Sequence, residues 1–392
     1  MIKLKKMKLV IAADIFPPDI GGPATYSKNL ATELKKNGHD VQVICYGDKF
    51  NRYDSEGGFN VIKIGRDKPL LFRYFEYFSN LLKVGKNVDL IYAMGPVSAG
   101  FPTMLASKIL KKKYIIKVVG DYAWEQARGR FNVKDGIDEF QDRRYSFKVE
   151  IFRKIQRKVA QKAHKVITPS HYLKGIIKGW GANEDNIKVI YNSVNFDFVN
   201  IIDKTEAQDK VRIKGKIIFS IARLVPWKGF EMLINLWPEL LVSDPDLKLV
   251  IAGDGPEGEK LKSLIVKREM EDSVFLVGKV EHKDLSNYFS ASDVFVLNSG
   301  YEGLSHVLIE AMAHKLPIIA SSKGGNLEVI KDSINGFLAE YNNKEEWKRS
   351  ILELVDNEEL KNKFIENSLG DLDRFKYETM INNTINFIEE IV

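Results

Sequence analysis

The stretch NSGYEGLSHVLIEAMAHKLPIIAS, residues 298–321, contains the end of a strand, a turn, a helix and a further strand. An apolar run ends near Ser299, glycines mark the turn, and apolar residues at helical spacing predict a helix over 304–315. Residues 317–321 then predict a buried strand. A strand–helix–strand unit of this kind is the repeating element of a parallel sheet covered by helices.

Two carboxylates bracket the start of the predicted helix. Glu302 lies in the turn and Glu310 lies within the helix. If residues 303–310 are helical, they rise roughly 12 Å along the helix axis. The two carboxylates are then too far apart to share one proton transfer, but they can contact opposite ends of one ligand.

The same alternation of short apolar runs and amphipathic segments extends along the whole chain. In the first half, the runs that predict strands are residues 8–13, 41–45, 89–94, 114–119, 166–169 and 188–192, with helices such as 26–37 and 99–112 between them. In the second half, the runs are residues 216–222, 247–252, 274–277, 293–297, 317–321 and 336–339.

Residues 195–214 interrupt the alternation, since they are polar and weakly periodic, and they predict a linker. The expected fold is therefore α/β, with two doubly wound Rossmann-like domains facing each other across a cleft. The first domain is expected over 1–198 and the second over 213–374. The last amphipathic stretch, 377–392, either ends the second domain or returns to pack on the first.

Composition limits the class of protein. A chain of 392 residues with 44% hydrophobic content can bury two cores. The single cysteine, Cys45, cannot form an intrachain disulfide, which favours a reducing cytoplasm. The apolar run at 8–13 meets Asp14 at once, so it predicts a core strand rather than a signal peptide, and no run has the length of a membrane span.

Charge is distributed unevenly between the two halves. Residues 1–198 contain 35 Lys and Arg against 20 Asp and Glu, a net charge of +15, whereas the remainder has a net charge of −9. Residues 143–165 predict a basic amphipathic helix with Phe147, Ile151, Ile155 and Val159 at four-residue spacing. Such a helix is most often a domain helix with a solvated face, but it can also lie against anionic lipid headgroups at the inner face of a membrane.

Several strand-end loops contain residue types that bind anions. Gly21 and Gly22 follow the first strand and precede a helix, whose free N–H groups can receive a phosphate. Arg223 and Lys228 follow the strand at 216–222, where two cations can neutralise a diphosphate. Gly253 follows the next strand. Each loop can equally be an ordinary turn with no ligand, and the missing G-x-G-x-x-G pattern counts against a dehydrogenase.

Asp121 lies beside Trp124 after the strand at 114–119. It predicts either a contact with ligand hydroxyls or the N-cap of the next helix, and the residues alone favour the cap. The histidines and the two Asp-x-Asp triplets lack metal-ligand spacing, so neither a metal nor a cofactor is expected.

In chain order, these residues resemble the family 4 glycosyltransferases, retaining enzymes of the GT-B architecture. The resemblance covers nearly the whole chain and is weakest over 50–140. Its most specific part is the E-G-L-x-x-x-x-x-E run that ends at Glu310, followed by Ala-Met-Ala. The other motifs are Gly21-Gly22, TPS at 168–170, YNSVN at 191–195, Arg223 with Lys228, and GDGP at 253–256.

The resemblance implies transfer of a hexose from a nucleotide diphosphate donor, UDP or GDP, to a glycan or lipid-linked acceptor in cell-envelope polysaccharide or glycolipid synthesis. It implies donor binding in the second domain and acceptor binding in the first, with no nucleic-acid partner. It also favours the return of the C-terminal helix, 377–392, to pack on the first domain. The implied donor contacts are Arg223 and Lys228 on the diphosphate, N–H groups at Gly21, Gly22, Gly303 and Leu304, the Gly253 turn, Lys279 and Val280 near the base, Glu310 on the ribose and Glu302 on the sugar. Fixed cations and a helix N-terminus can stabilise the departing diphosphate without a metal.

One position departs from the family pattern. Members commonly have a histidine after the strand that ends near Val119, where this chain has Gly120 and Asp121. Asp121 is therefore a candidate catalytic residue that orients the sugar or the acceptor. Two other functions stay open, namely a sugar-nucleotide epimerase or hydrolase on the same fold and a non-catalytic protein that binds nucleotide sugars.

Overall fold

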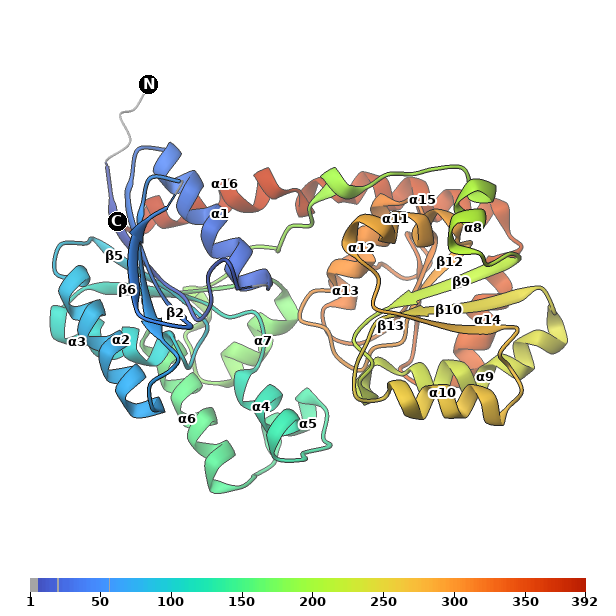
Figure 1. The fold of residues 1–392 in the computed structure, drawn as a ribbon, viewed down its shortest axis with the longest axis horizontal. Helices are drawn as coiled ribbons and strands as arrows, with labels where there is room; N and C mark the ends of the chain where they lie inside the picture. Colours follow the sequence, from blue (N-terminus) through green and yellow to red (C-terminus); the bar gives the residue numbers. More distant parts are fainter. Residues whose placement is uncertain (1–5, 20, 56) are drawn as a thin grey trace. The chain divides into compact units, whose positions relative to one another are not determined.

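The computed structural model describes residues 6–19, 21–55 and 57–392. They form two compact units, which we call the first domain (residues up to Ile190, with Ile381–Val392) and the second domain (Tyr191–Met380). Each domain is a mainly parallel sheet with helices on both faces (Figure 1). Among the described residues, no helix combines the length and apolarity needed to cross a bilayer.

The first domain is built on an eight-stranded sheet with the order β3-β4-β2-β1-β5-β6-β7-β8. All neighbouring strands are parallel except β3 and β4. The strands are β1 (Lys8–Ala12), β2 (Asp40–Gly47), β3 (Asn51–Asp54), β4 (Asn60–Gly65), β5 (Leu90–Met94), β6 (Lys113–Lys117), β7 (Lys165–Thr168) and β8 (Ile187–Val189). The chain first adds strands on one side of β1 and then, from β5, on the other, so β1 and β5 form the switch point of this sheet.

Helices cover both faces of the first sheet. On one face, α2, α3 and α6 pack over alternate strand residues such as Val10, Ile44 and Ile91 (Figure 1). On the other, Tyr26 of α1 places its hydroxyl 3.0 Å from that of Tyr92 and 3.4 Å from that of Thr384 in α16. The helices are α1 (Gly22–Lys36), α2 (Leu70–Gly85), α3 (Gly100–Leu110), α4 (Tyr122–Arg130), α5 (Ile137–Asp142), α6 (Phe147–Lys162), α7 (His171–Gly179) and, from Ile381 on, α16 (Tyr377–Ile391).

The second domain has a six-stranded parallel sheet with the order β11-β10-β9-β12-β13-β14. Its strands are β9 (Lys216–Ile221), β10 (Leu247–Ala252), β11 (Val274–Gly278), β12 (Val294–Leu297), β13 (Ile318–Ser321) and β14 (Phe337–Ala339). The switch point of this sheet lies between β9 and β12. Residues on successive strand positions enter two separate cores, as Ile218 and Phe219 do, because side chains alternate between the faces of a strand.

Helices α9, α10 and α14 lie on one face of the second sheet, and α8, α11 and α12 lie on the other (Figure 1). Their bounds are α8 (Lys204–Val211), α9 (Phe230–Ser243), α10 (Gly258–Lys267), α11 (His282–Ala291), α12 (His306–Ala313), α13 (Asn326–Val329), α14 (Lys344–Val355) and α15 (Glu358–Asp371). The predicted linker at 195–214 is wrong, because it contains α8, whose Ala207 is fully buried in the core against α11. The short amphipathic period of α8 was hidden by its many charged residues.

The prediction for the basic helix also needs correction. In α6, only the second half of the stripe is buried: Val159 is 0% exposed and Ile155 packs against the core, whereas Phe147 is 79% exposed and Ile151 is 38% exposed. The buried positions include Arg153, whose guanidinium donates to the carbonyls of Gln141 and Arg143 at 2.7 and 2.6 Å. These hydrogen bonds turn the arginine inward and leave apolar side chains among exposed lysines.

Candidate active site

The second-domain switch point brings two loops together. The loop after β9 and the loop after β12 are joined by hydrogen bonds from the Gly300 N–H to the Trp227 carbonyl at 2.7 Å and from the Asn298 side-chain amide to the Gly229 carbonyl at 3.1 Å. Both loops lie at the carboxyl ends of adjacent parallel strands. Open α/β sheets bind ligands at this place.

Lys228 and Glu302 form an ion pair across these two loops. The Lys228 ammonium donates to Glu302 Oε1, and each side chain is 15% exposed. A diphosphate that binds Lys228 must therefore compete with, or lie beside, the Glu302 carboxylate. Arg223, at the start of the same loop as Lys228, is exposed and forms no ion pair with another described residue. The structure thus places the paired Lys228, the exposed Arg223 and the Glu302 carboxylate at the carboxyl ends of β9 and β12.

The start of α12 differs from the prediction. The helix begins at His306, so residues 303–305 are not helical and the predicted rise of roughly 12 Å over 303–310 does not apply. The reason is the neighbouring loop: the Gly325 N–H donates to the Glu302 carbonyl at 2.7 Å, and a Cβ on Gly325 would lie 2.3 Å from the Gly303 carbonyl oxygen. This packing holds Gly303 and Leu304 in an extended turn.

Ser305 is a site residue that the sequence analysis missed. It is the N-cap of α12 and is 1% exposed, yet its hydroxyl has no hydrogen-bond partner among the described residues. The first N–H groups of a helix also lack intrahelical partners. A buried hydroxyl at a helix N-terminus beside the Lys228–Glu302 pair suits an oxyanion. In the sequence, Ser305 could have been found as a helix N-cap from its position between Gly303 and the predicted helix.

Glu310 lies in α12 and has a partner that the sequence analysis also missed. His282 Nε2, at the start of α11, lies 3.7 Å from Glu310 Oε1. Burial raises the pKa of Glu310, and the nearby His282 opposes that shift. The signal for His282 was its position directly after β11, at the same edge of the sheet. The spacing of histidines along the sequence cannot reveal such a pair, because the two residues lie in different helices.

Gly253 is required by backbone packing. Its φ is +137°, and a Cβ there would lie 1.9 Å from the Ala222 carbonyl oxygen. The loop after β10 thus lies directly against the loop of Arg223, and the Leu224 N–H donates to the Asp254 carbonyl at 2.9 Å. The turn interpretation explains this glycine, which shapes the Arg223 loop.

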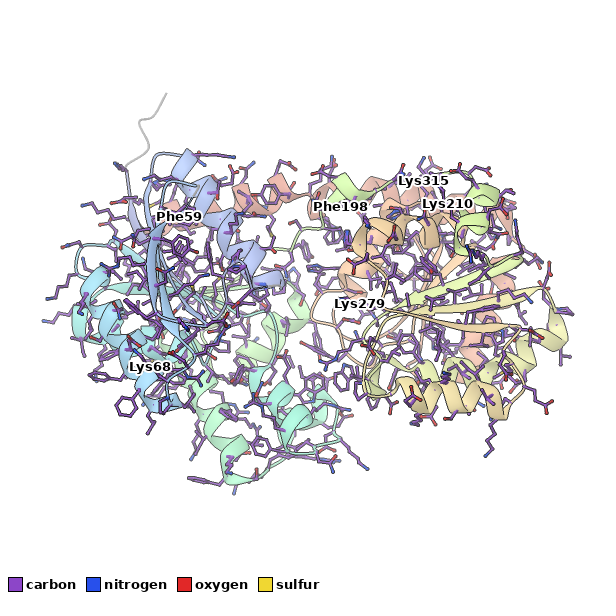
Figure 2. All side chains as sticks on the ribbon, in the orientation of Figure 1. Phe59, Lys68, Phe198, Lys210, Lys279 and Lys315 are labelled. Carbon is purple, nitrogen blue, oxygen red and sulfur yellow. The ribbon has the colours of Figure 1, made fainter. Side chains whose placement is uncertain are left out.

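The remaining predicted donor residues lie in two places. Lys279 is exposed beyond the end of β11, and Val280 is half-buried against the α11 core (Figure 2). Gly21 and Gly22 belong to the first domain, where Gly21 is the N-cap and Gly22 the first residue of α1. That helix start has no side-chain cap, so its N–H groups face no capping oxygen.

Asp121 has a structural role. Its side chain is 0% exposed and accepts hydrogen bonds from the Trp124 N–H and from the side-chain amides of Gln141 and Gln156, at 2.8–3.0 Å. It is the N-cap of α4. Three donors already occupy this buried carboxylate, so the structure gives no support to the prediction that Asp121 contacts sugar or acceptor, which stays a prediction. The N-cap interpretation is confirmed.

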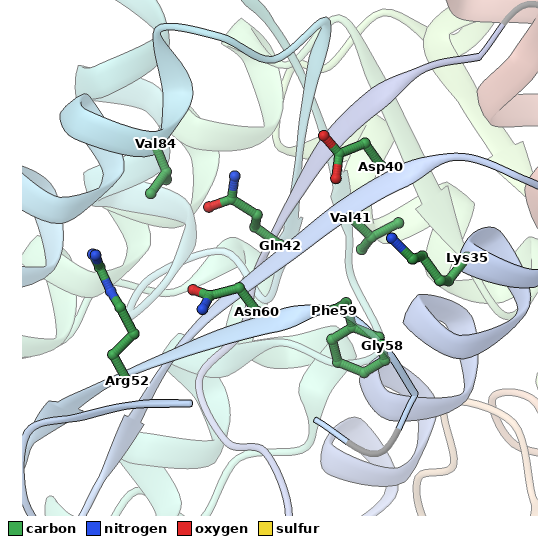
Figure 3. Close-up of a pocket in the computed structure, with 9 residues that line it drawn as sticks. All are labelled: Lys35, Asp40, Val41, Gln42, Arg52, Gly58, Phe59, Asn60 and Val84. Carbon is green, nitrogen blue, oxygen red and sulfur yellow. The ribbon is translucent and has the colours of Figure 1, made fainter. Parts of the chain in front are cut away.

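Within the part of the chain that the structure describes, no three His, Cys, Asp or Glu side chains cluster in a way that could hold a metal ion. A hollow of ≈ 410 Å³ lies at the amino ends of β2 and β4, where Gln42, Arg52 and Asn60 line it (Figure 3). This hollow is at the sheet edge opposite the switch point and so does not belong to the candidate site.

Comparison with known proteins identifies the chain over both domains. The sequence profile of Glycosyltransferase Family 4 matches residues 20–198, and that of Glycosyl transferases group 1 matches residues 202–370. An uncharacterized glycosyltransferase of Methanocaldococcus jannaschii is 27% identical over 394 residues, covering 97% of this chain and 98% of its own. Alpha-monoglucosyldiacylglycerol synthase of Streptococcus pneumoniae is 25% identical over 346 residues, covering 85% and 75%.

Solved structures give the same result for the fold. The crystal structure of the Anabaena protein HepE in complex with UDP and glucose superposes with a TM-score of 0.77 at 18% sequence identity, covering 98% of this chain and 100% of its own. The predicted α/β class and GT-B architecture are confirmed. The chain is an enzyme and belongs to the family 4 glycosyltransferases.

Proposed function

We propose that this enzyme transfers a hexose, with retention of configuration and without a metal ion, from a nucleotide diphosphate sugar to a glycan or lipid-linked acceptor. The observation that carries the proposal is the Lys228–Glu302 pair at the second-domain switch point, beside Arg223 and the N-terminus of α12. Lys228, Arg223 and the N–H groups of α12 would receive the diphosphate. Glu302 would contact the sugar, and Glu310 with His282 the ribose.

The chemistry of transfer explains why these groups suit the role. When the bond between the anomeric carbon and the phosphate breaks, positive charge develops on the sugar and negative charge on the departing diphosphate. Fixed cations and a helix N-terminus stabilise the diphosphate, and a carboxylate near the sugar stabilises the opposite charge. Front-face attack on the sugar would retain its configuration without a covalent intermediate on the protein.

Nucleotide binding is the first test. UDP, GDP and ADP, and then UDP-sugars, are screened by thermal unfolding, because a ligand of the folded state raises the unfolding temperature. UDP comes first because it occupies the HepE structure. Lys228→Ala should abolish the shift, whereas Lys262→Ala, which removes an exposed lysine of α10, should retain it. If no nucleotide stabilises the protein, the proposed function is wrong.

Product analysis separates the alternatives. Transfer requires both donor and acceptor, whereas an epimerase or a hydrolase consumes the donor alone. Nuclear magnetic resonance of the product anomer tests retention, and assays with excess EDTA test independence from metal ions. Full loss of turnover with EDTA, restored by a divalent cation, would contradict the metal-free proposal. A non-catalytic binding protein would bind the donor and consume none.

We place the acceptor at a membrane, with the protein bound to its cytoplasmic surface. The exposed face of α6 combines Phe147 and Ile151 with Lys148, Lys154 and Lys158. The first half of α2 adds four exposed apolar residues, Leu70, Leu71, Phe72 and Phe75, which are 57–82% exposed. Apolar side chains among cations suit an anionic lipid surface, and the name of the pneumococcal relative points to a lipid acceptor.

Sedimentation with vesicles of phosphatidylcholine and phosphatidylglycerol tests this surface. Triple reversal of Lys148, Lys154 and Lys158 to Glu should release the protein. The matched control reverses Lys28, Lys35 and Lys36, which are exposed on α1 and change the net charge equally. Arg153 is kept, since it is buried and its reversal would disturb folding. Equal binding of the two triple variants would contradict the α6 surface.

A further inference from the structure

The first domain also has a polar cluster at its switch point. Asp14 follows β1 and Gly95 follows β5, and a Cβ on Gly95 would lie 3.0 Å from Asp14 Oδ2. The absence of a side chain at Gly95, whose φ is +99°, is thus what leaves room for the carboxyl group. This is the place in the first sheet that corresponds to the Lys228–Glu302 pair in the second.

The Asp14 carboxyl group is incompletely satisfied. The Ala99 N–H hydrogen-bonds the carboxylate, but Oδ1 is buried and has no hydrogen-bond partner among the described residues. Burial raises the pKa of Asp14 to about 7, against the opposing effects of Ala99 and Arg66. A buried carboxyl oxygen without a partner is costly for the fold. Such an atom at the carboxyl end of a strand indicates a ligand that supplies the missing hydrogen bond.

Hydroxyl groups surround this carboxyl group. Tyr74 of α2 and Tyr122 of α4 both interact with the Ser98 side chain, and both are half-buried. Deeper in the cluster, Tyr46 donates to the Ser98 carbonyl at 3.3 Å and its ring stacks on Tyr77 at 4.7 Å. The stacked rings of Tyr46 and Tyr77 therefore lie beneath the half-buried hydroxyls of Tyr74 and Tyr122.

The charges favour an uncharged ligand. Asp14 would repel a phosphate or a carboxylate, and Arg66 is already paired with Asp19 at 2.6 Å. Arg73 lies close enough to Tyr74 to lower its pKa, so an anionic ligand has to be tested directly. Hydroxyl groups both donate and accept, and a sugar ring also stacks on aromatic rings. A sugar satisfies Asp14, Ser98 and the tyrosines together.

We propose that Asp14, Tyr74, Ser98 and Tyr122 form the subsite for an uncharged sugar ring of the acceptor, with Asp14 Oδ1 hydrogen-bonded to one of its hydroxyls. The proposal rests on the proposed function, because it names the acceptor of that reaction. In this subsite, Tyr74 and Tyr122 orient the ring through their hydroxyls. Tyr122 is itself fixed by an edge contact with Phe152 at 5.7 Å between ring centroids.

Saturation-transfer difference NMR tests the subsite with the whole protein. The probes are the methyl α-glycosides of glucose, galactose and mannose, and glucose 6-phosphate is the anionic probe. Asp14→Asn, Tyr74→Phe and Tyr122→Phe each keep shape and remove one group. Each should weaken glycoside binding about 10-fold. Tyr114→Phe is the matched control, since it removes a hydroxyl that donates to the Val159 carbonyl elsewhere in this domain.

The variant Glu302→Ala shows whether the glycoside binds in the first or in the second domain. A glycoside signal that survives Glu302→Ala and Tyr114→Phe but falls in the two other tyrosine variants supports the subsite, even if Asp14→Asn fails to fold. A signal lost only in Glu302→Ala, or binding of glucose 6-phosphate without any glycoside, overturns it. Stabilisation by UDP is measured in the same samples. If UDP does not stabilise the wild type, the proposed function is contradicted. If UDP stabilises the wild type but the tyrosine variants leave the glycoside signal unchanged, only the subsite is contradicted.

Discussion

The two switch points have the same topology and opposite electrostatics. In the second domain, Lys228 and Glu302 neutralise each other beside the exposed Arg223. In the first domain, Asp14 has a carboxyl oxygen with no hydrogen-bond partner among the residues that the structure describes, and hydroxyl groups surround it. The net charges of the two halves of the chain have the opposite signs. The half with a net charge of +15 contains Asp14, and the half with a net charge of −9 contains Arg223 and Lys228. Net charge of a domain therefore does not predict the charge of its site.

The largest expected effect is on the cationic switch point. Lys228→Ala should lower the rate of sugar transfer by about 100- to 1000-fold, because it removes a cation that stabilises the departing diphosphate. Initial rates with a nucleotide sugar measure the effect, and Lys262→Ala is the control. A rate for Lys228→Ala within twofold of the wild type would contradict the proposal that the second-domain switch point binds the diphosphate.

A second prediction compares glycines of the two domains. Gly253→Ala should lower the free energy of unfolding by about 3 kcal/mol, because the new Cβ would overlap the Ala222 carbonyl oxygen. Gly22→Ala places its Cβ where no atom lies within 4 Å, and it should change stability by less than about 1 kcal/mol. Urea unfolding followed by circular dichroism measures both. Equal stabilities would show that the Gly253 loop can move away from β9.

A third prediction separates two carboxylates that the sequence placed together. Asp121→Asn should lower the free energy of unfolding by about 1–3 kcal/mol, since a buried acceptor of three hydrogen bonds is impaired. Turnover of the folded protein should stay near that of the wild type. Glu302→Gln should do the reverse, with slow transfer and little change in stability. A slow but fully stable Asp121→Asn enzyme would return Asp121 to the list of catalytic candidates.

The last prediction concerns a buried lysine of the first domain, and its effect depends on pH. Lys117 lies 3.9 Å from the centre of the Tyr26 ring, and burial lowers its pKa from 10.5 to about 7. Between pH 7 and 10.5 the unfolded chain holds a proton that the folded protein lacks, so this lysine makes stability rise with pH over that window. Below pH 7 the folded protein bears the full cost of the buried charge.

Lys117→Met should therefore raise the unfolding temperature at pH 6 and raise it less at pH 9.5. Thermal unfolding of both proteins at the two pH values measures the difference. The second domain provides the comparison, because Lys216 is half-buried but paired with Asp244 at 2.8 Å, and its pKa is raised. An equal gain at both pH values would show that Lys117 is not neutral in the folded protein.

The sequence was informative wherever one strand or one short motif determines the outcome. Apolar runs predicted most strands, since period and composition are local, and the E-G-L run with Glu302 and Glu310 carried the family resemblance. The strands β3 and β4, the helix α8 and the exposed apolar residues of α6 were missed or misassigned. In each case partners distant in the chain decide what is buried, as the carbonyls of Gln141 and Arg143 do for Arg153.

Sequence alone thus determined the α/β class, the second-domain motifs and the residue types that we propose bind a diphosphate. Only the tertiary structure decided which residues meet: Lys228 with Glu302, His282 with Glu310, and Gly95 with Asp14. It also decided that Asp121 is enclosed by Gln141 and Gln156. The physical reason is that parallel strands place their carboxyl ends at one edge whatever their order in the chain. Strand order sets which loops meet there, and strand order is a property of the folded sheet.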